Sequence, residues 1–199
     1  MEHFHILTRN QDVNPLVLAI KRRPELWQED TFLRHYPQGP FGETEAIMLR
    51  FPVIATGLTD EEIQAYKENR LPGHDQHESV DQPAYKILHE ARPLVMGLMA
   101  RVGGERLGRV IINKIKPGGR IFRHADTPEH ANYYTRFHIV LQGNPGAVIV
   151  CGDFEGEKAE AFNMVTGDVF WFNNKLEHEV FNNSNDDRIS MVVDIRTSR

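Results

Sequence analysis

The sequence predicts a mostly β fold with flanking helices, of the sandwich or jelly-roll type. The character of the chain changes near residue 105, where helical patterns and loops give way to short apolar segments separated by turn residues. Several of these segments alternate apolar and polar residues and are rich in Val, Ile and Phe, as half-buried strands are. Short strands at this spacing are typical of a sandwich or jelly roll. The expected strands are residues 46–51, 109–115, 120–124, 134–141, 147–152, 160–164, 168–173, 178–183 and 189–195.

Three helices are expected in the first half of the chain, at residues 14–27, 58–69 and 83–103. The second begins with Thr59 and Glu62 at the spacing of a capping box. The third has apolar residues at helical spacing and a proline near its middle, which we expect to kink or divide it.

Two polar, turn-rich stretches, 34–45 and 71–83, are long enough to be functional loops, and we expect them to act as lids. The second contains a cluster of acidic residues and histidines, GHDQHE. Because no pattern places this cluster on a rigid element, we expect a solvated loop rather than a metal site.

The 199 residues fit a single domain, in which a helical and loop part, 1–105, packs on a catalytic core, 106–199. The net charge of -5 makes a broad electrostatic grip on nucleic acid unexpected. The one cysteine, Cys151, excludes an internal disulfide and a CxxC zinc site. We find no signal peptide and no apolar run as long as a membrane span, so a cytoplasmic protein is expected. Oligomeric state is not indicated by the sequence.

The segment RHADTPEH contains the first two candidate metal ligands. His124 and Asp126 are two residues apart, so on an extended segment both side chains point to the same side. His178, at the start of a late strand, is the natural second imidazole. Two histidines and one carboxylate form the facial triad that binds Fe(II) and leaves positions open for a co-substrate and dioxygen.

Other interpretations of this segment stay open at the level of sequence. DTPEH is also typical of a turn that Asp126 caps, beside a surface histidine. Glu129 and His130 compete as ligands from the same loop.

Arg188 begins a strand ten residues after the second histidine. Its fork of donors matches a carboxylate bidentately, so it could bind the distal carboxylate of a dicarboxylate chelated to the metal. The alternative is an ordinary ion pair with Asp186 or Asp187.

Three further residues could line the same pocket. Arg136 and His138 share one face of their strand and would place charge and donors near the metal. The alternative is a rim arginine and a core histidine. Asn113 could donate to a bound carboxylate, or it could bond the local backbone at the end of its strand. Trp171 and Phe172 are expected in the core.

Together, these residues resemble the aspartyl/asparaginyl β-hydroxylase family, over a little under half of the chain, about 109–195. The resemblance rests on H-x-D at 124–126, R-x-H at 136–138, GDVFWFNN at 167–174, His178, and R-I-S at 188–190 leading into VVDI. It implies a double-stranded β-helix of the cupin-like type, with Fe(II) and 2-oxoglutarate as co-substrate. By the same resemblance, His124 and His178 are metal ligands and Arg188 binds the distal carboxylate of 2-oxoglutarate. Arg136 and His138 would line that pocket.

The sequence departs from the family in two ways. The animal peptidyl hydroxylases lack the metal carboxylate, which Asp126 provides here, so the chain is more similar to small bacterial or phage members, including hydroxylases of free amino acids. No family motif is present in residues 1–105.

We therefore expect a 2-oxoglutarate-dependent dioxygenase that hydroxylates an amino acid or a peptidyl side chain, with a small-molecule or peptide substrate. Two alternatives remain from the sequence. One is a cupin-like sugar epimerase or isomerase, which would use a histidine as base without metal. The other is a non-catalytic binding barrel, in which the three candidate ligands would not converge.

Overall fold

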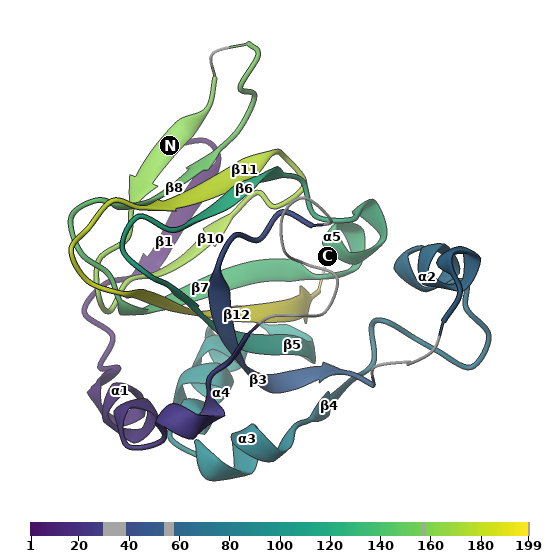
Figure 1. Ribbon diagram of the computed structural model, residues 1–199, viewed down its shortest axis with the longest axis horizontal. Helices are drawn as coiled ribbons and strands as arrows, with labels where there is room; N and C mark the ends of the chain where they lie inside the picture. The colour runs from purple at the N-terminus through teal and green to yellow at the C-terminus, as the bar shows by residue number, and fades with distance from the viewer. Residues whose placement is uncertain (30–38, 54–57, 157, 199) are drawn as a thin grey trace.

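A computed structural model describes residues 1–29, 39–53, 58–156 and 158–198, which form two antiparallel sheets (Figure 1). The strands of the larger sheet are β1 (Phe4–Thr8), β2 (Gln28–Glu29), β3 (Thr44–Pro52), β4 (Ser79–Asp81), β5 (Gly104–Ile115), β7 (Thr135–Gln142), β10 (Val169–Phe172) and β12 (Arg188–Thr197). They run in the order β1-β10-β7-β12-β5-β3-β2, and β4 also pairs with β3. The smaller sheet has the order β6-β11-β8-β9, formed by β6 (Arg120–His124), β8 (Ala147–Cys151), β9 (Glu160–Asn163) and β11 (His178–Asn182). The predicted jelly roll with flanking helices is confirmed.

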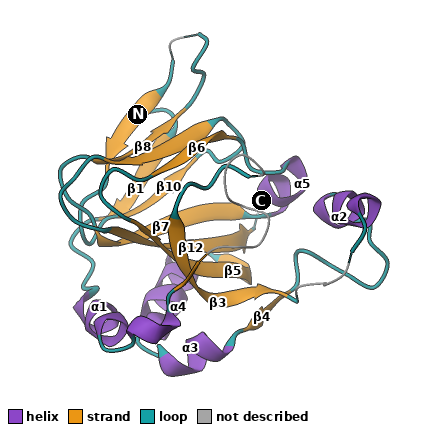
Figure 2. Cartoon of the chain, in the orientation of Figure 1, coloured by secondary structure: helices purple, strands orange, loops and turns teal. Residues whose placement is uncertain are grey.

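The helices lie mainly outside the larger sheet (Figure 2). They are α1 (Asn14–Lys21), α2 (Asp60–Lys67), α3 (Pro83–Ile87), α4 (Ala91–Arg101) and α5 (Pro128–Tyr133), with a 3-10 turn at Pro24–Leu26. In the figure, α1, α3 and α4 lie below the larger sheet, opposite the smaller one, while α2 projects to the right. None of these helices is long and apolar enough to cross a membrane.

Alternation along β12 separates the hydrophobic core from the space between the sheets. Met191, Val193 and Ile195 pack into the cluster that the larger sheet shares with α1, α3 and α4. The intervening residues point to the other face, where Arg188 lines a cavity. On β5 and β7 the same alternation places polar side chains between the sheets. The fold thus buries several polar groups along one inner face.

Every expected strand is present, although β5 begins earlier than expected, at Gly104. The capping box at Thr59 and Glu62 is confirmed, with both reciprocal hydrogen bonds formed. The third expected helix is divided into α3 and α4 just before Pro93, as its proline predicted. The first is shorter than expected, because α1 ends before Pro24 and only a 3-10 turn follows.

The GHDQHE segment is a loop, as expected, but it is only partly solvated: Asp75 and Glu78 are exposed, whereas Gln76 and His77 are buried. Gln76 and His77 are 3% and 5% exposed, respectively. The ring of His77 stacks on Tyr133, with centroids 3.9 Å apart and an angle of 5° between the rings. Asn69 accepts a hydrogen bond from the backbone N–H of Gln76 through Oδ1 (2.9 Å) and donates to Asp75 through Nδ2 (3.2 Å). The loop is held against α5, a helix that the sequence pattern did not predict.

The other expected lid, 34–45, lies partly outside the described residues. Of its described portion, Phe41 forms an isolated bridge with Ile121 of β6, and Gly42 donates to the Arg120 carbonyl (3.2 Å). A Cβ at Gly42 would lie 2.6 Å from that carbonyl oxygen, so this close approach requires glycine. Phe41 is thereby brought beside His124, with ring centroids 6.1 Å apart.

Candidate metal centre

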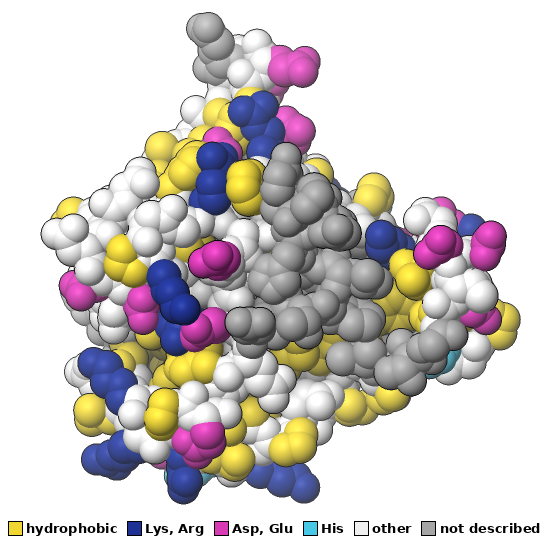
Figure 3. Space-filling view, viewed as in Figure 1, with side chains coloured by type: hydrophobic (Ala, Val, Ile, Leu, Met, Phe, Trp, Pro, Cys, Tyr) yellow, Lys and Arg dark blue, Asp and Glu magenta, His cyan; other side chains and the backbone are white. Residues whose placement is uncertain are grey.

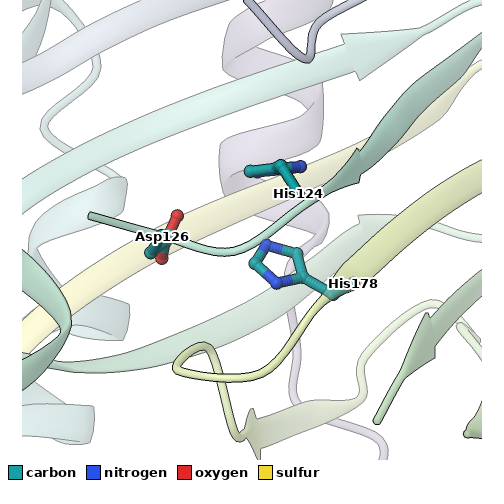
Figure 4. Close-up of side chains that lie close together, drawn as sticks. All are labelled: His124, Asp126 and His178. Atoms are coloured by element: carbon teal, nitrogen blue, oxygen red, sulfur yellow. The ribbon is translucent and has the colours of Figure 1, made fainter. Parts of the chain in front are cut away.

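The three predicted metal ligands come together at one end of the smaller sheet (Figure 4). His124 is the last residue of β6, and His178, the first of β11, is directly opposite it in the strand pairing. Asp126 follows two residues after β6. One donor atom of each residue lies within 4.8 Å of the others. Figure 4 shows the three side chains gathered around one space.

Both imidazoles are oriented by the same local contact. The Nδ1 of His124 lies 2.8 Å from the carbonyl oxygen of Phe122, and the Nδ1 of His178 lies 3.0 Å from that of Leu176. Because a carbonyl only accepts, Nδ1 carries a proton in each ring, and Nε2 is the ring atom that can bind a metal. Burial lowers the pKa of His178 to about 4, so this ring is neutral near pH 7.

The carboxylate of Asp126 is held by two donors. Arg136 Nη1 donates to Oδ2 at 2.7 Å, and Asn174 Nδ2 donates to the same oxygen at 2.8 Å. Burial acts to raise the pKa of Asp126, but the Arg136 charge and the Asn174 hydrogen bond outweigh it and keep the pKa below its ordinary value. The carboxylate is therefore ionised, and both described side-chain hydrogen bonds leave Oδ1 for another partner.

A cavity between the sheets connects the triad with the other predicted site residues. Its lining combines charged and amide groups with apolar side chains of both sheets. The residues are Phe41, Arg109, Ile111, Asn113, Ile121, His124, Arg136, His138, Ile149, Phe172, His178, Val180, Arg188 and Val192. All predicted site residues except Asp126 appear in this lining. Asp126 contacts the lining through the hydrogen bond that it accepts from Arg136.

Arg188 is a buried cation without a carboxylate partner among the described residues. Its side chain is 1% exposed. One Nη donates to the sulfur of Met164 at 3.1 Å, and Nε has no hydrogen-bond partner in the described parts of the chain. Burial lowers the pKa of Arg188 to about 10. Arg188 forms no ion pair with Asp186 or Asp187. The alternative that the sequence left open for this arginine, a surface ion pair after the turn, is therefore wrong.

His138 and Asn113 line the same cavity as Arg188 and the two histidines of the triad. His138 bonds Ser190 Oγ through Nδ1 (2.9 Å) and stacks on Phe170 with ring centroids 5.1 Å apart. Burial, then the charges of Arg188 and Arg136, lower the pKa of His138 well below its ordinary value, so the ring is neutral. Asn113 is 7% exposed and pairs with Ser190 in the strand register.

Arg136 lines this cavity, and its guanidinium is held by two carboxylates. Besides Asp126, it binds Asp194 bidentately, from Nε to Oδ1 (2.8 Å) and from Nη2 to Oδ2 (2.9 Å). Asp194 is fully buried. Sequence reasoning assigned no role to Asp194 or Asn174, although both lie in the quoted segments VVDI and GDVFWFNN. Alternation along β12 places Asp194 on the same face as Arg188, a signal that could have found it.

The competing ligands within DTPEH lie elsewhere. His130, on α5, is buried and donates from Nε2 to Asp194 Oδ2 at 2.7 Å. Glu129 is exposed and lies near His77, with 3.8 Å between its Oε1 and the ring Nε2. Neither belongs to the triad cluster. Two imidazoles at paired strand ends and one carboxylate two residues beyond β6 have the donor types of an Fe(II) facial triad.

Comparisons with known structures agree with this architecture. A 2OG-Fe(II) oxygenase family oxidoreductase from Burkholderia pseudomallei matches with a TM-score of 0.62 and 14% identity, over 98% of this chain and 86% of that one. A Pseudomonas putida prolyl-4-hydroxylase matches with a TM-score of 0.54 and 15% identity, over 99% and 94%. A Trichoplax adhaerens prolyl hydroxylase, solved with a hypoxia inducible factor peptide fragment, gives 0.62 and 11%, over 98% and 83%. At these identities the likeness establishes the fold.

Sequence comparison identifies the family. A search of curated proteins finds no match. The family model described as aspartyl/asparaginyl beta-hydroxylase matches residues 80–198, which include every residue of the triad and Arg188. Because this match spans more than half of the sequence, the chain belongs to the aspartyl/asparaginyl β-hydroxylase family.

Proposed function

We propose that this protein is an Fe(II)- and 2-oxoglutarate-dependent dioxygenase that hydroxylates an amino acid or a peptidyl side chain. The observation that carries the proposal is Arg188, a buried guanidinium that faces the same cavity as the triad without a carboxylate partner in the described chain. An uncompensated buried charge is costly, and a bound anion would offset that cost. A dicarboxylate that reaches from the metal to Arg188 fits this requirement.

The residues present fit the metal. His124, Asp126 and His178 would hold Fe(II), with the two Nε2 atoms and the free carboxylate oxygen as ligands. Bound Fe(II) would supply activation of dioxygen: one oxygen atom would enter the substrate and the other would enter succinate, as 2-oxoglutarate is oxidised and loses carbon dioxide. The chain supplies geometry: strands β6 and β11 orient the imidazoles, and Asn174 and Arg136 orient the carboxylate.

The rest of the cavity would bind the co-substrate and exclude water. Arg188 would bind the distal carboxylate with charge-assisted hydrogen bonds. His138 and Asn113 would line the middle of the co-substrate site and offer polar contacts. Apolar side chains of both sheets, including Ile149 and Val180, complete the wall and limit access of water to the site.

We propose that the whole chain works as one catalytic unit. The core at 106–199 holds every named site residue, and the part at 1–105 contributes Phe41 to the cavity wall and three helices against the larger sheet. The substrate is proposed to be a small molecule or a peptide, in keeping with the family and with the peptide bound to the prolyl hydroxylase named above. Figure 3 shows basic and acidic side chains interspersed on one face, without the broad basic field that a nucleic-acid backbone favours.

The alternative functions are less well supported. A metal-free epimerase needs a histidine that can take up a proton, yet His138 is buried beside two guanidinium groups that disfavour its protonation. A non-catalytic barrel would not need three ligands within 4.8 Å of one another.

The test is the formation of succinate from 2-oxoglutarate by purified protein with Fe(II) and ascorbate. Turnover without the true substrate is expected to be slow, and a panel of amino acids and peptides should contain a compound that stimulates it. Asp126→Ala and His178→Ala should abolish the metal-dependent signal. A wild-type protein that neither turns over nor binds Fe(II) and 2-oxoglutarate would exclude the proposed reaction.

A further inference from the structure

The candidate ligand Asp126 belongs to a buried network of three charged side chains. The guanidinium of Arg136 lies between two carboxylates, with one hydrogen bond to Asp126 and two to Asp194. Asp194 is 0% exposed and sits on β12, opposite Arg136 of β7 in the strand register. The two residues therefore face each other from adjacent strands of the larger sheet.

The geometry divides the guanidinium unequally between its partners. Nε and Nη2 form the parallel pair of bonds to Asp194 that is typical of a strong arginine–carboxylate pair. Only Nη1 remains for Asp126, and it contacts Oδ2. Arg136 thus holds one oxygen of the ligand and leaves the other for a cation.

The charges lead to the same conclusion. Asp126 and Asp194 carry two negative charges and Arg136 one positive charge, so the group retains one negative charge for a metal. Without Asp194, Arg136 would have Asp126 as its one described carboxylate partner. It would then neutralise the only carboxylate of the triad and compete with the cation for it.

We propose that Asp194 is a positioning residue of the metal centre: it holds Arg136 in a bidentate pair, so that Arg136 orients Asp126 without neutralising it. This inference rests on the proposed metal site. Asp194 itself touches neither the metal nor the substrate and acts through Arg136.

A purely structural role for Asp194 makes different predictions. Asp194 also accepts a hydrogen bond from His130 of α5 at 2.7 Å, so its removal could simply loosen that helix. In that case the protein would lose stability, but the folded fraction would bind metal normally. Replacement of His130 would then reproduce every effect of replacing Asp194.

The experiment measures the dissociation constant of Mn(II), an air-stable substitute for Fe(II), by titration calorimetry without co-substrate. Asp194→Asn is expected to weaken Mn(II) binding by about 100-fold, because Arg136 would then both neutralise Asp126 and orient it less well. The double variant Asp194→Asn/Arg136→Met removes the competing guanidinium and restores the net charge of −1. We expect its affinity to recover to about tenfold below wild type, because the competing charge is gone but one of the two donors to Asp126 is lost with it.

Two controls separate positioning from stability. His130→Phe removes the α5 hydrogen bond and keeps the Arg136 pair, and Asp168→Asn alters a buried carboxylate that accepts a backbone hydrogen bond outside the site. Both should bind Mn(II) like wild type, even if they are less stable. An unchanged affinity in Asp194→Asn, or the same loss in His130→Phe, would overturn the inference.

The outcome remains decisive if Asp194→Asn alone does not fold. The double variant must still bind Mn(II) within about tenfold of wild type, and a loss of about 100-fold there overturns the proposal. If the wild-type protein does not bind Mn(II), the proposed metal site is wrong as well. Wild-type binding with no effect of Asp194→Asn contradicts the positioning role alone.

Discussion

His124 and His178 lie opposite each other in paired strands and are oriented by the same contact, from Nδ1 to the carbonyl two residues earlier in the chain. Their ring centroids are 4.3 Å apart. Each strand thus fixes the tautomer of its own histidine, and the pairing of β6 with β11 sets their separation. The imidazole half of the centre is prepared by the backbone before any metal binds.

The buried neutral histidines predict how stability depends on pH. The pKa of His178 is about 4 in the folded protein, against about 6.5 when unfolded, so the unfolded chain binds more protons between these values. This contribution is fully present above pH 6.5 and is lost as the pH falls towards 4; it amounts to roughly 3 kcal/mol. His138 acts in the same direction. Denaturant unfolding of the metal-free protein should show lower stability at pH 5 than at pH 7.5, and equal stability would contradict the assignment.

Arg188→Met should separate stability from co-substrate binding. Removing an uncompensated buried charge is expected to stabilise the metal-free protein by about 1–2 kcal/mol, because a similar apolar volume replaces it. The same change should weaken 2-oxoglutarate binding to the Mn(II) form about 100-fold, through loss of a charge-assisted pair. Thermal unfolding and calorimetry test both effects. A destabilised variant that still binds 2-oxoglutarate normally would show that Arg188 stabilises the fold and does not bind the co-substrate.

Asn174→Ala removes one of the two donors to the Asp126 carboxylate. We expect Mn(II) affinity to fall about tenfold, because the ligand becomes freer to rotate. The adjacent Asn173→Ala is the matched control, since its side chain accepts only a local bond from Lys175 and does not contact Asp126. Equal effects of the two substitutions would contradict an orienting role for Asn174.

Gly42→Ala tests whether the segment before β3 supports the site. The added Cβ would meet the Arg120 carbonyl at 2.6 Å, so the segment must move and carry Phe41 away from His124. A stability loss of about 1–3 kcal/mol and a raised KM for the co-substrate or substrate are expected. Gly97→Ala is the control: its Cβ meets nothing within 4 Å in α4, and it should stabilise by about 0.5–1 kcal/mol. Unchanged kinetics in Gly42→Ala would show that this segment does not support the site.

Much of the fold could be predicted because its signals are local. Alternation in segments such as 189–195 determines both the strand and the face of each side chain, and the two-residue spacing of His124 and Asp126 needed only an extended backbone. Asp126, His178 and Arg188 follow one another along the chain, each at or near the start or end of an expected strand. This succession indicated that they belong to one site.

The remaining features depend on contacts between distant parts of the chain. β1 is a short apolar segment whose strand conformation comes from pairing with β10. α5 has only six residues and little periodicity, although Pro128 at its start is a recognised signal. The partner of Arg136 could not be chosen from sequence, because Asp194 lies 58 residues away and reaches it through the pairing of β7 with β12.

The central claim is that the triad and Arg188 form one site for Fe(II) and 2-oxoglutarate. The most direct measurement is the visible charge-transfer absorption of a 2-oxo acid chelated to Fe(II), recorded without oxygen. Wild-type protein should develop this band on addition of both components, Asp126→Ala and His178→Ala should not, and Arg188→Met should need about 100-fold more 2-oxoglutarate. A wild-type protein without the band, or an Arg188→Met variant with unchanged 2-oxoglutarate dependence, would contradict the account.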